Sequence, residues 1–252
     1  MGGDQALGDI YEMPPFPPCI KGHWRINPNR PIRTCPWGAA RAVWSAWHGI
    51  WPKPTAEVKK STNLEVVMAR IPVPTRESVP EEYRGVYDEV VQSRGGPPAS
   101  GPGTVTLNSP EVANRCNQLS EYLRRGSGLP AKVQELAMLT VARELDCQYI
   151  WNAHVAAGRR EGLSDALVDA IRDRKDLPAM AAEEAAVVNY GREFFRTHKV
   201  SDAAFQAARD EFGVHGLTNL TNLMGYYALL AFNANAFQID LPAERTETTL
   251  PI

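Results

Sequence analysis

The segment QELAMLTVARELDCQYIWNAHVAAGRREGL places a carboxylate, a thiol and an imidazole within twenty residues: Glu135, Cys147 and His154. Glutamate and histidine side chains can transfer a proton near neutral pH, and a cysteine becomes a nucleophile as its thiolate. Cys147 and His154 are seven residues apart, so on one helix they share a face with a rise of about 10 Å between them. The segment therefore offers two chemistries, proton transfer and thiol chemistry.

Two helices have to position these side chains. The sequence predicts helices over residues 131–145 and 147–161. Asp146 is a good N-cap residue, which would place Cys147 in the first helical turn, where the positive end of the helix dipole favours a thiolate. Glu135 lies on the preceding helix, so that helix must fold back for the carboxylate to reach the site.

Apolar residues recur at three- and four-residue spacing over most of the chain after residue 65, and no alternating strand pattern of comparable length is present. Short loops between amphipathic helices make neighbouring helices pack antiparallel, so we predict an all-α helical bundle. The last helix is apolar on most sides from Leu220 to Phe237, which indicates a central position or a subunit interface. The other predicted helices are 80–93, 109–125, 164–172, EEAAVVNYGREFFRTH, SDAAFQAARDEFG and HGLTNLTNLMGYYALLAFNANAF. The segment PPASGPGTVTLNSP, rich in Pro, Gly and Ser, is predicted to be a loop.

Residues 1–64 differ in composition from the rest of the chain. They contain nine of the 20 prolines and five of the six tryptophans. Prolines at this density prevent long helices and a central sheet. Three interpretations stay open: an irregular tail, an arm whose tryptophans dock on the body or on a neighbouring subunit, and an over-extended gene start before Met68. We predict an irregular Pro/Trp-rich arm over residues 1–64 and a helical domain over residues 65–252.

The composition narrows the classes of partner. The 252 residues carry a formal net charge of -2, which gives no basic surface for nucleic acid or anionic lipid. No run of 18 apolar residues and no leader-like start occur, so we expect a cytoplasmic protein without a membrane partner. The histidines form no metal-binding pair, no Gly-rich phosphate loop follows a strand, and the cysteines are scattered, so we expect neither metal nor cofactor. The four cysteines are Cys19, Cys35, Cys116 and Cys147.

The order of five residues in the middle of the chain is typical of one known family: Glu135, Cys147, Tyr149, Trp151 and His154. Together with GPGTVTLNSPEVANRCNQLSEYLRRGSGLP before this segment and VSDAAFQAARDEFGVHGLTNLTNLMGYYALLAFNANAF after it, the pattern resembles the carboxymuconolactone decarboxylase family, relatives of alkyl hydroperoxidase D. The resemblance spans about two-thirds of the chain. It implies an all-helical fold, a homo-oligomer such as a dimer, trimer or hexamer, and a pocket between helices near the Glu and the His.

The chain departs from the family pattern at two positions. Peroxidase members carry CxxC before the His, whereas Ile150 occupies the second cysteine position here, which argues against a local dithiol cycle. Many decarboxylase-like members have Glu directly after the Tyr and often have His before Ser-Pro-Glu; here these positions are Ile150 and Asn108. Two groups that could transfer protons are therefore replaced.

Our first functional hypothesis is a cofactor-independent lyase, decarboxylase or isomerase acting on a small lactone, unsaturated acid or aromatic-derived carbonyl compound. His154 and Glu135 would transfer the proton, Cys147 is a third candidate catalytic residue, and Tyr149 would donate to an enolate. Two alternatives stay open: a single-cysteine peroxidase or redox sensor using Cys147, and a non-catalytic oligomeric binding protein. The expected substrate-binding residues are Tyr149, Trp151, Ile150, Asn108 and Tyr226.

Overall fold

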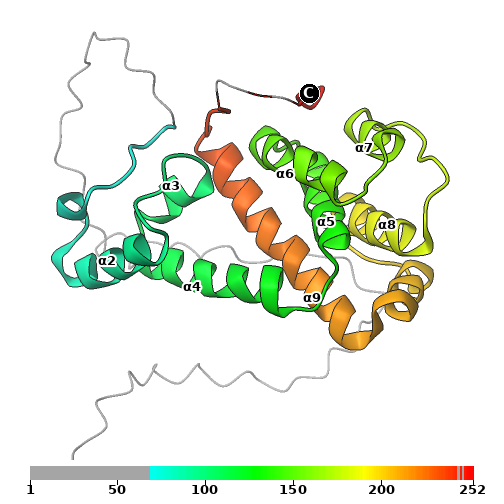
Figure 1. Cartoon of the computed structure of the whole chain (residues 1–252), viewed down its shortest axis with the longest axis horizontal. Helices are drawn as coiled ribbons and strands as arrows, with labels where there is room; N and C mark the ends of the chain where they lie inside the picture. The colour runs from blue at the N-terminus through cyan, green and yellow to red at the C-terminus, as the bar shows by residue number, and fades with distance from the viewer. Residues whose placement is uncertain (1–68, 243–244, 246) are drawn as a thin grey trace, which may run out of the picture. The chain divides into compact units, whose positions relative to one another are not determined.

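The computed structural model describes residues 69–242, 245 and 247–252 (Figure 1). These residues form helices and no strand, which confirms the all-α prediction. The predicted arm over residues 1–64 and the predicted domain start at residue 65 lie outside the described residues, so the division of the chain stays a prediction.

The helices follow the predicted order closely. Residues 102–106 differ, because they form a short helix where we expected only a loop, with a proline in its first turn and the left-handed Gly101 before it. The elements are η1 (Arg76–Ser78), η2 (Glu81–Tyr83), α2 (Arg84–Ser93), α3 (Pro102–Thr106), α4 (Pro110–Glu121), η3 (Tyr122–Gly126), α5 (Ala131–Glu144), α6 (Gln148–Arg160), α7 (Asp165–Arg172), α8 (Ala182–Thr197) and α9 (Asp202–Ala236).

Helix α9 bends sharply at Gly213, where its two predicted halves meet (Figure 1). The φ of Gly213 is 63° and its ψ is 175°, a backbone conformation that only glycine adopts without a large steric cost. The second half of the helix then buries one face along its length, from Leu217 to Ala234. The bend thus allows one continuous segment to pack in two directions.

Helix α5 is the centre of the core. Every residue from Val133 to Arg143 is buried, and the helix packs against α6, α8 and α9. Gly158 lets α6 approach α5 closely, because a Cβ atom there would lie 2.9 Å from Leu163 Cδ1 and 3.2 Å from Leu139 Cδ1. The same added Cβ atom would lie 3.6 Å from the Cβ atom of Glu135, so the two helices approach closely beside Glu135. The backbones of α5 and α6 are therefore held together at the level of the candidate site.

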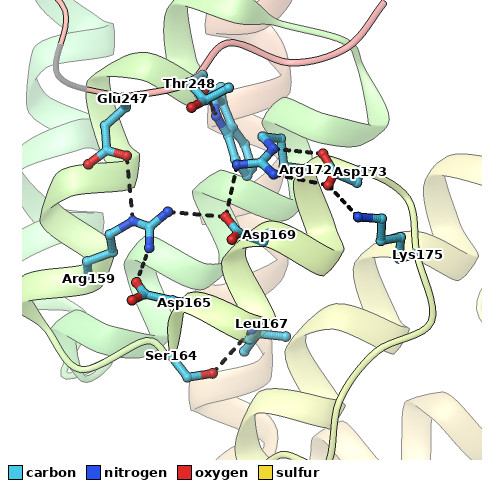
Figure 2. Close-up of polar contacts among 11 residues, drawn as sticks. Arg159, Ser164, Asp165, Leu167, Asp169, Arg172, Asp173, Lys175, Glu247 and Thr248 are labelled. Carbon is cyan, nitrogen blue, oxygen red and sulfur yellow. Dashed lines mark hydrogen bonds and ion pairs between the residues drawn. The ribbon is translucent and has the colours of Figure 1, made fainter.

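The last residues of the chain run back over α6, and we call residues 247–251 the C-terminal strap. The Gln148 side chain donates to the Leu250 carbonyl at 2.7 Å and accepts from the Leu250 N–H at 2.8 Å. Trp151 Nε1 donates to the Thr248 carbonyl at 3.1 Å. Arg159 lies between Glu247 of the strap and the carboxylates of Asp165 and Asp169, as Figure 2 shows. The strap therefore joins the end of the chain to α6.

We predict that Leu250→Ala lowers the free energy of unfolding by about 2 kcal/mol or more, because Leu250 is only 3% exposed and belongs to the core. Ile252→Ala is the matched control, since that side chain is 79% exposed and should change stability by less than about 0.5 kcal/mol. Urea unfolding followed by circular dichroism measures both. Equal midpoints for the two variants would show that the strap is not part of the folded core.

Candidate functional site

Glu135 on α5 and His154 on α6 lie in contact. His154 Nδ1 is 2.8 Å from Glu135 Oε2, and the two side chains are 12% and 9% exposed. An ionised carboxylate only accepts hydrogen bonds, so Nδ1 carries the proton when Glu135 is charged, and the lone pair of a neutral ring then lies on Nε2. The fold-back that the sequence required has brought the acid and the imidazole together.

Among the residues that the structure describes, the second oxygen of Glu135 has no hydrogen-bond partner. The guanidinium of Arg124 is 3.9 Å from Glu135 Oε1, too far for a hydrogen bond. One oxygen of the carboxylate is therefore fixed by His154, and the other is available to a ligand under the influence of a positive charge.

Arg124 is positioned by η3, a single π-helical turn at the end of α4. Such turns occur often at functional sites, because the wider winding redirects side chains. Gln134 Nε2 donates to the Arg124 carbonyl at 3.1 Å and to the Leu129 carbonyl at 2.8 Å. Asn219 on α9 donates to the Ser127 carbonyl at 3.0 Å. The turn that carries Arg124 is thus tied to both α5 and α9.

A cavity of about 350 Å³ lies beside this carboxylate. Glu135 belongs to its lining and His154 does not, so Glu135 is the member of the pair that borders the cavity. The lining is mostly polar and holds charges of both signs. It comprises Ser120, Glu121, Arg124, Arg125, Ala131, Gln134, Glu135 and Glu161.

Two tyrosines of α9 complete the surroundings of the pair. The Tyr227 ring meets the His154 ring edge to face, with 5.1 Å between centroids and an interplanar angle of 82°. Tyr226 packs against Tyr227 in the same manner at 5.7 Å. Burial raises the pKa of both phenols, so both are neutral at physiological pH. The sequence prediction named Tyr226 as substrate-binding; the ring in contact with His154 is Tyr227.

The middle of the chain matches the model of a known family. Residues 110–193, which include both Glu135 and His154, match the model of the carboxymuconolactone decarboxylase family. The match confirms the resemblance of this region to that family. No curated protein matches the chain.

Solved structures show the same fold at low identity. A protein of unknown function from Agrobacterium tumefaciens, described as a putative antioxidant defence protein AhpD, is 22% identical with a TM-score of 0.51, covering 56% of this chain and 97% of that one. An uncharacterised peroxidase-related protein from Ralstonia eutropha, an alkylhydroperoxidase AhpD core, is 18% identical with a TM-score of 0.55, covering 70% and 93%. An uncharacterised peroxidase-related protein from Silicibacter is 15% identical with a TM-score of 0.55, and the match covers 73% of this chain and 96% of that one. The likeness confirms the predicted fold.

Cys147 of the family motif occupies a different place from the one expected. It is the N-cap of α6 and not a first-turn residue, because Asp146 adopts a left-handed conformation and pairs with Arg143 and Arg174 at 2.9 Å each. The thiol is fully buried, and burial raises its pKa, although hydrogen bonds from the backbone of Ile150 and Tyr149 act in the opposite direction. At neutral pH the buried thiol is therefore protonated.

The remaining motif residues have contacts of their own. The Tyr149 hydroxyl lies 3.1 Å from Ser100 Oγ, and its ring packs over Gly101. Trp151 is 1% exposed, with its N–H held by the strap, and Ile150 is equally buried. Asn108 is exposed and donates to carbonyls of the α3 region at 3.2 Å. None of the four belongs to the lining of the cavity beside Glu135.

The described part of the chain contains no group of three or more His, Cys, Asp or Glu side chains arranged to hold a metal ion. Within the same residues, no helix combines the length and the apolarity needed to cross a bilayer.

We predict that iodoacetamide modifies Cys147 of the folded protein at least about tenfold more slowly than Cys116, because Cys147 is fully buried and Cys116 is only partly buried, while burial raises the pKa of both thiols. Mass spectrometry of the two cysteine peptides measures both rates in one sample. In urea the difference should disappear, which controls for peptide detection. Equal rates in the folded protein would show that Cys147 is accessible.

Proposed function

We propose that the Glu135–His154 pair is the proton-transfer centre of a cofactor-independent lyase, decarboxylase or isomerase, acting on a small lactone, unsaturated acid or aromatic-derived carbonyl compound. The observation that carries the proposal is the 2.8 Å contact between the imidazole and one carboxylate oxygen of Glu135, a residue that lines a cavity. A base with fixed orientation, held within reach of a bound ligand, is what general acid–base catalysis requires.

In the isomerase form of the reaction, Glu135 Oε1 takes a proton from the carbon next to a carbonyl group. The C–H bond breaks, an O–H bond forms on Glu135, and the electron pair moves into the carbonyl to give an enolate. Return of the proton to another carbon shifts the double bond. His154 holds Oε2 throughout, and Arg124, 3.9 Å from Oε1, lowers the energy of the negative charge on the enolate.

In the decarboxylase form, the C–C bond to a carboxylate β to the carbonyl breaks, and its electron pair gives the same enolate with release of carbon dioxide. A proton from Glu135 then completes the product, so Glu135 starts this cycle as the acid and takes a proton from water before the next turnover. The two forms share one intermediate and one proton carrier. The two reactions differ in substrate and product, so a panel of substrates distinguishes between them.

A second candidate is a single-cysteine thiol peroxidase or redox sensor. The observation in its favour is the position of Cys147 at the N-cap of α6, where the backbone of Ile150 and Tyr149 lowers the pKa of the thiol against the larger effect of burial. Two structural neighbours are described as peroxidase-related proteins. In this reaction the thiolate attacks a peroxide, giving a sulfenic acid and an alcohol or water. Detection of a sulfenic acid at Cys147 but not at Cys116 after mild peroxide treatment would support it.

We expect Glu135→Gln and His154→Ala each to lower turnover on the true substrate by about 10²- to 10⁴-fold, because each removes the base or the group that orients it. Cys147→Ser should retain most activity and is the matched control. The measurement is carbon dioxide release and isomerisation over a panel of unsaturated lactones and β-keto or γ-carboxy acids. Loss only in Cys147→Ser would move the assignment to thiol chemistry, and binding without turnover would favour a non-catalytic protein.

We also propose a homo-oligomer, a dimer, trimer or hexamer, in a cytoplasmic setting. The support is an apolar strip on α9, where Leu229 is 41% exposed and Phe232 is 76% exposed, less than one turn apart. Such side chains are unfavourable in water and are typical of interfaces.

If the strip is an interface, Phe232→Ser should lower the molar mass measured by light scattering after size exclusion, because it removes an apolar anchor. Val214→Ser is the control, since Val214 is 73% exposed but lies beside the bend at Gly213, at the far end of the second half of α9 from this strip. A wild-type protein with the mass of one chain would contradict the proposal.

A further inference from the structure

Two arginines of the η3 turn line the cavity beside Glu135, and their surroundings differ. Arg125 forms a salt bridge with Glu121, one turn earlier in the chain. The guanidinium of Arg124 forms no hydrogen bond with any residue that the structure describes, and its single ion-pair contact among them is the one at 3.9 Å with Glu135 Oε1. Arg125 is therefore engaged, whereas Arg124 presents hydrogen-bond donors that still lack an acceptor.

The backbone holds Arg124 at the cavity. Its carbonyl accepts from Gln134 Nε2 at 3.1 Å, and Gln134, which is 8% exposed, belongs to the same lining. Leu123, the preceding residue, is 1% exposed, and its carbonyl accepts from Ser127 Oγ at 2.6 Å. The base of the Arg124 side chain is thus fixed, while the side chain itself is 46% exposed and accessible to a ligand that enters from solvent.

The charges in the lining favour an anion at Arg124. Three carboxylates belong to the lining, and two of them have partners: Glu121 pairs with the neighbouring arginine of the turn, and Glu135 contacts His154. The third, Glu161, is exposed, so water and salt screen its charge. A guanidinium carries five N–H donors in a planar fork that matches the two oxygens of a carboxylate. Arg124 can therefore pair with a ligand carboxylate while its charge still acts on Glu135.

We propose that Arg124 determines the specificity of this site: its guanidinium binds a carboxylate group of the substrate and places the adjoining carbon chain beside Glu135. This inference rests on the proposed function and deepens it, because it narrows the substrates to those that carry a carboxylate and excludes neutral lactones. The cavity of about 350 Å³ is at the small end of the range for ligand sites, so the acid is a small one.

A carboxylate bound at Arg124 also constrains the reaction. In the isomerase form this carboxylate stays bound while the double bond shifts, so substrate and product are held in the same way. In the decarboxylase form, a guanidinium paired with the carboxylate that leaves would stabilise the ground state more than the transition state and slow the loss of carbon dioxide. A decarboxylase substrate of this site therefore carries two carboxylates, one that Arg124 binds and one that leaves.

The test uses benzoate and benzamide as probes. The two molecules have nearly the same shape and differ in charge, and neither has a hydrogen on the carbon next to its carbonyl group, so neither is turned over. Isothermal titration calorimetry measures the binding of both probes to the full chain as wild type, Arg124→Gln and Arg125→Gln. Arg125→Gln is the matched control, because it removes the same charge from the same turn and the same lining, but from an arginine that Glu121 already engages.

We expect wild type to bind benzoate at least about tenfold more tightly than benzamide. Arg124→Gln should weaken benzoate binding about 10- to 100-fold, the usual effect of a hydrogen bond to a charged group, and leave benzamide binding within about twofold. Arg125→Gln should change neither affinity by more than about threefold. Equal affinities of wild type for the two probes, equal losses in the two variants, or no benzoate binding by wild type at millimolar concentration overturns the proposal. Circular dichroism checks the folding of both variants, and the comparison of the two probes on wild type does not depend on them.

Binding of these probes needs no turnover, so the result is independent of the substrate panel. A chain that binds benzoate through Arg124 but turns over none of the panel would retain the carboxylate site and lose the proposed reaction. A chain whose turnover depends on Glu135 but whose benzoate binding ignores Arg124 would retain the reaction and lose the carboxylate site.

Discussion

The burial of Glu135 is the constraint on which the rest of the site depends. A carboxylate in the middle of an apolar helix is unfavourable unless hydrogen bonds and opposite charge compensate for lost water. His154 supplies the hydrogen bond at 2.8 Å, and Arg124 supplies the charge at 3.9 Å. Both come from other elements, so α6 and η3 must lie where they do for α5 to remain in the core. One ionisable group thereby fixes the relative positions of three segments.

Close packing is what keeps this arrangement rigid. Gly158 allows the α5 and α6 backbones to approach, and a larger residue there would meet Leu163 and Leu139. The strap adds hydrogen bonds to Gln148 and Trp151 on another part of α6. The helix that carries His154 is therefore held against α5 at one position and by the chain terminus at another. An imidazole on such a support keeps its orientation when a ligand enters.

The helices that carry the site could be predicted from the sequence, because helix formation depends on the local spacing of apolar residues. The helix pair that carries Glu135 and His154 follows from apolar spacing, and the short connection between the two helices predicts that they fold back on each other. Tyr227 could not be chosen in the same way. Tyr226 and Tyr227 are adjacent and both buried, so the pattern does not say which ring meets His154; the bend at Gly213 and the packing of α9 decide it.

Other features escaped prediction for related physical reasons. The π turn that carries Arg124 looks like the end of an ordinary helix in the sequence, since it differs only in its winding. The strap has no periodicity at all, and its position depends on hydrogen bonds to residues about 100 positions earlier. Asp146 has the residue type of an N-cap, but two arginines engage its carboxylate and Cys147 takes the cap position.

Charge balance favours proton transfer over thiol chemistry in this fold. A thiolate at Cys147 would place a negative charge on a fully buried atom, and burial already raises the pKa of that thiol. Glu135 lines a cavity, holds its partners already, and has Arg124 close to where an enolate would form. Moving a proton between Glu135 and a ligand transfers negative charge within that prearranged environment. The dense core that excludes water from Cys147 is also what fixes His154 against Glu135, so the packing that disfavours the nucleophile supports the base.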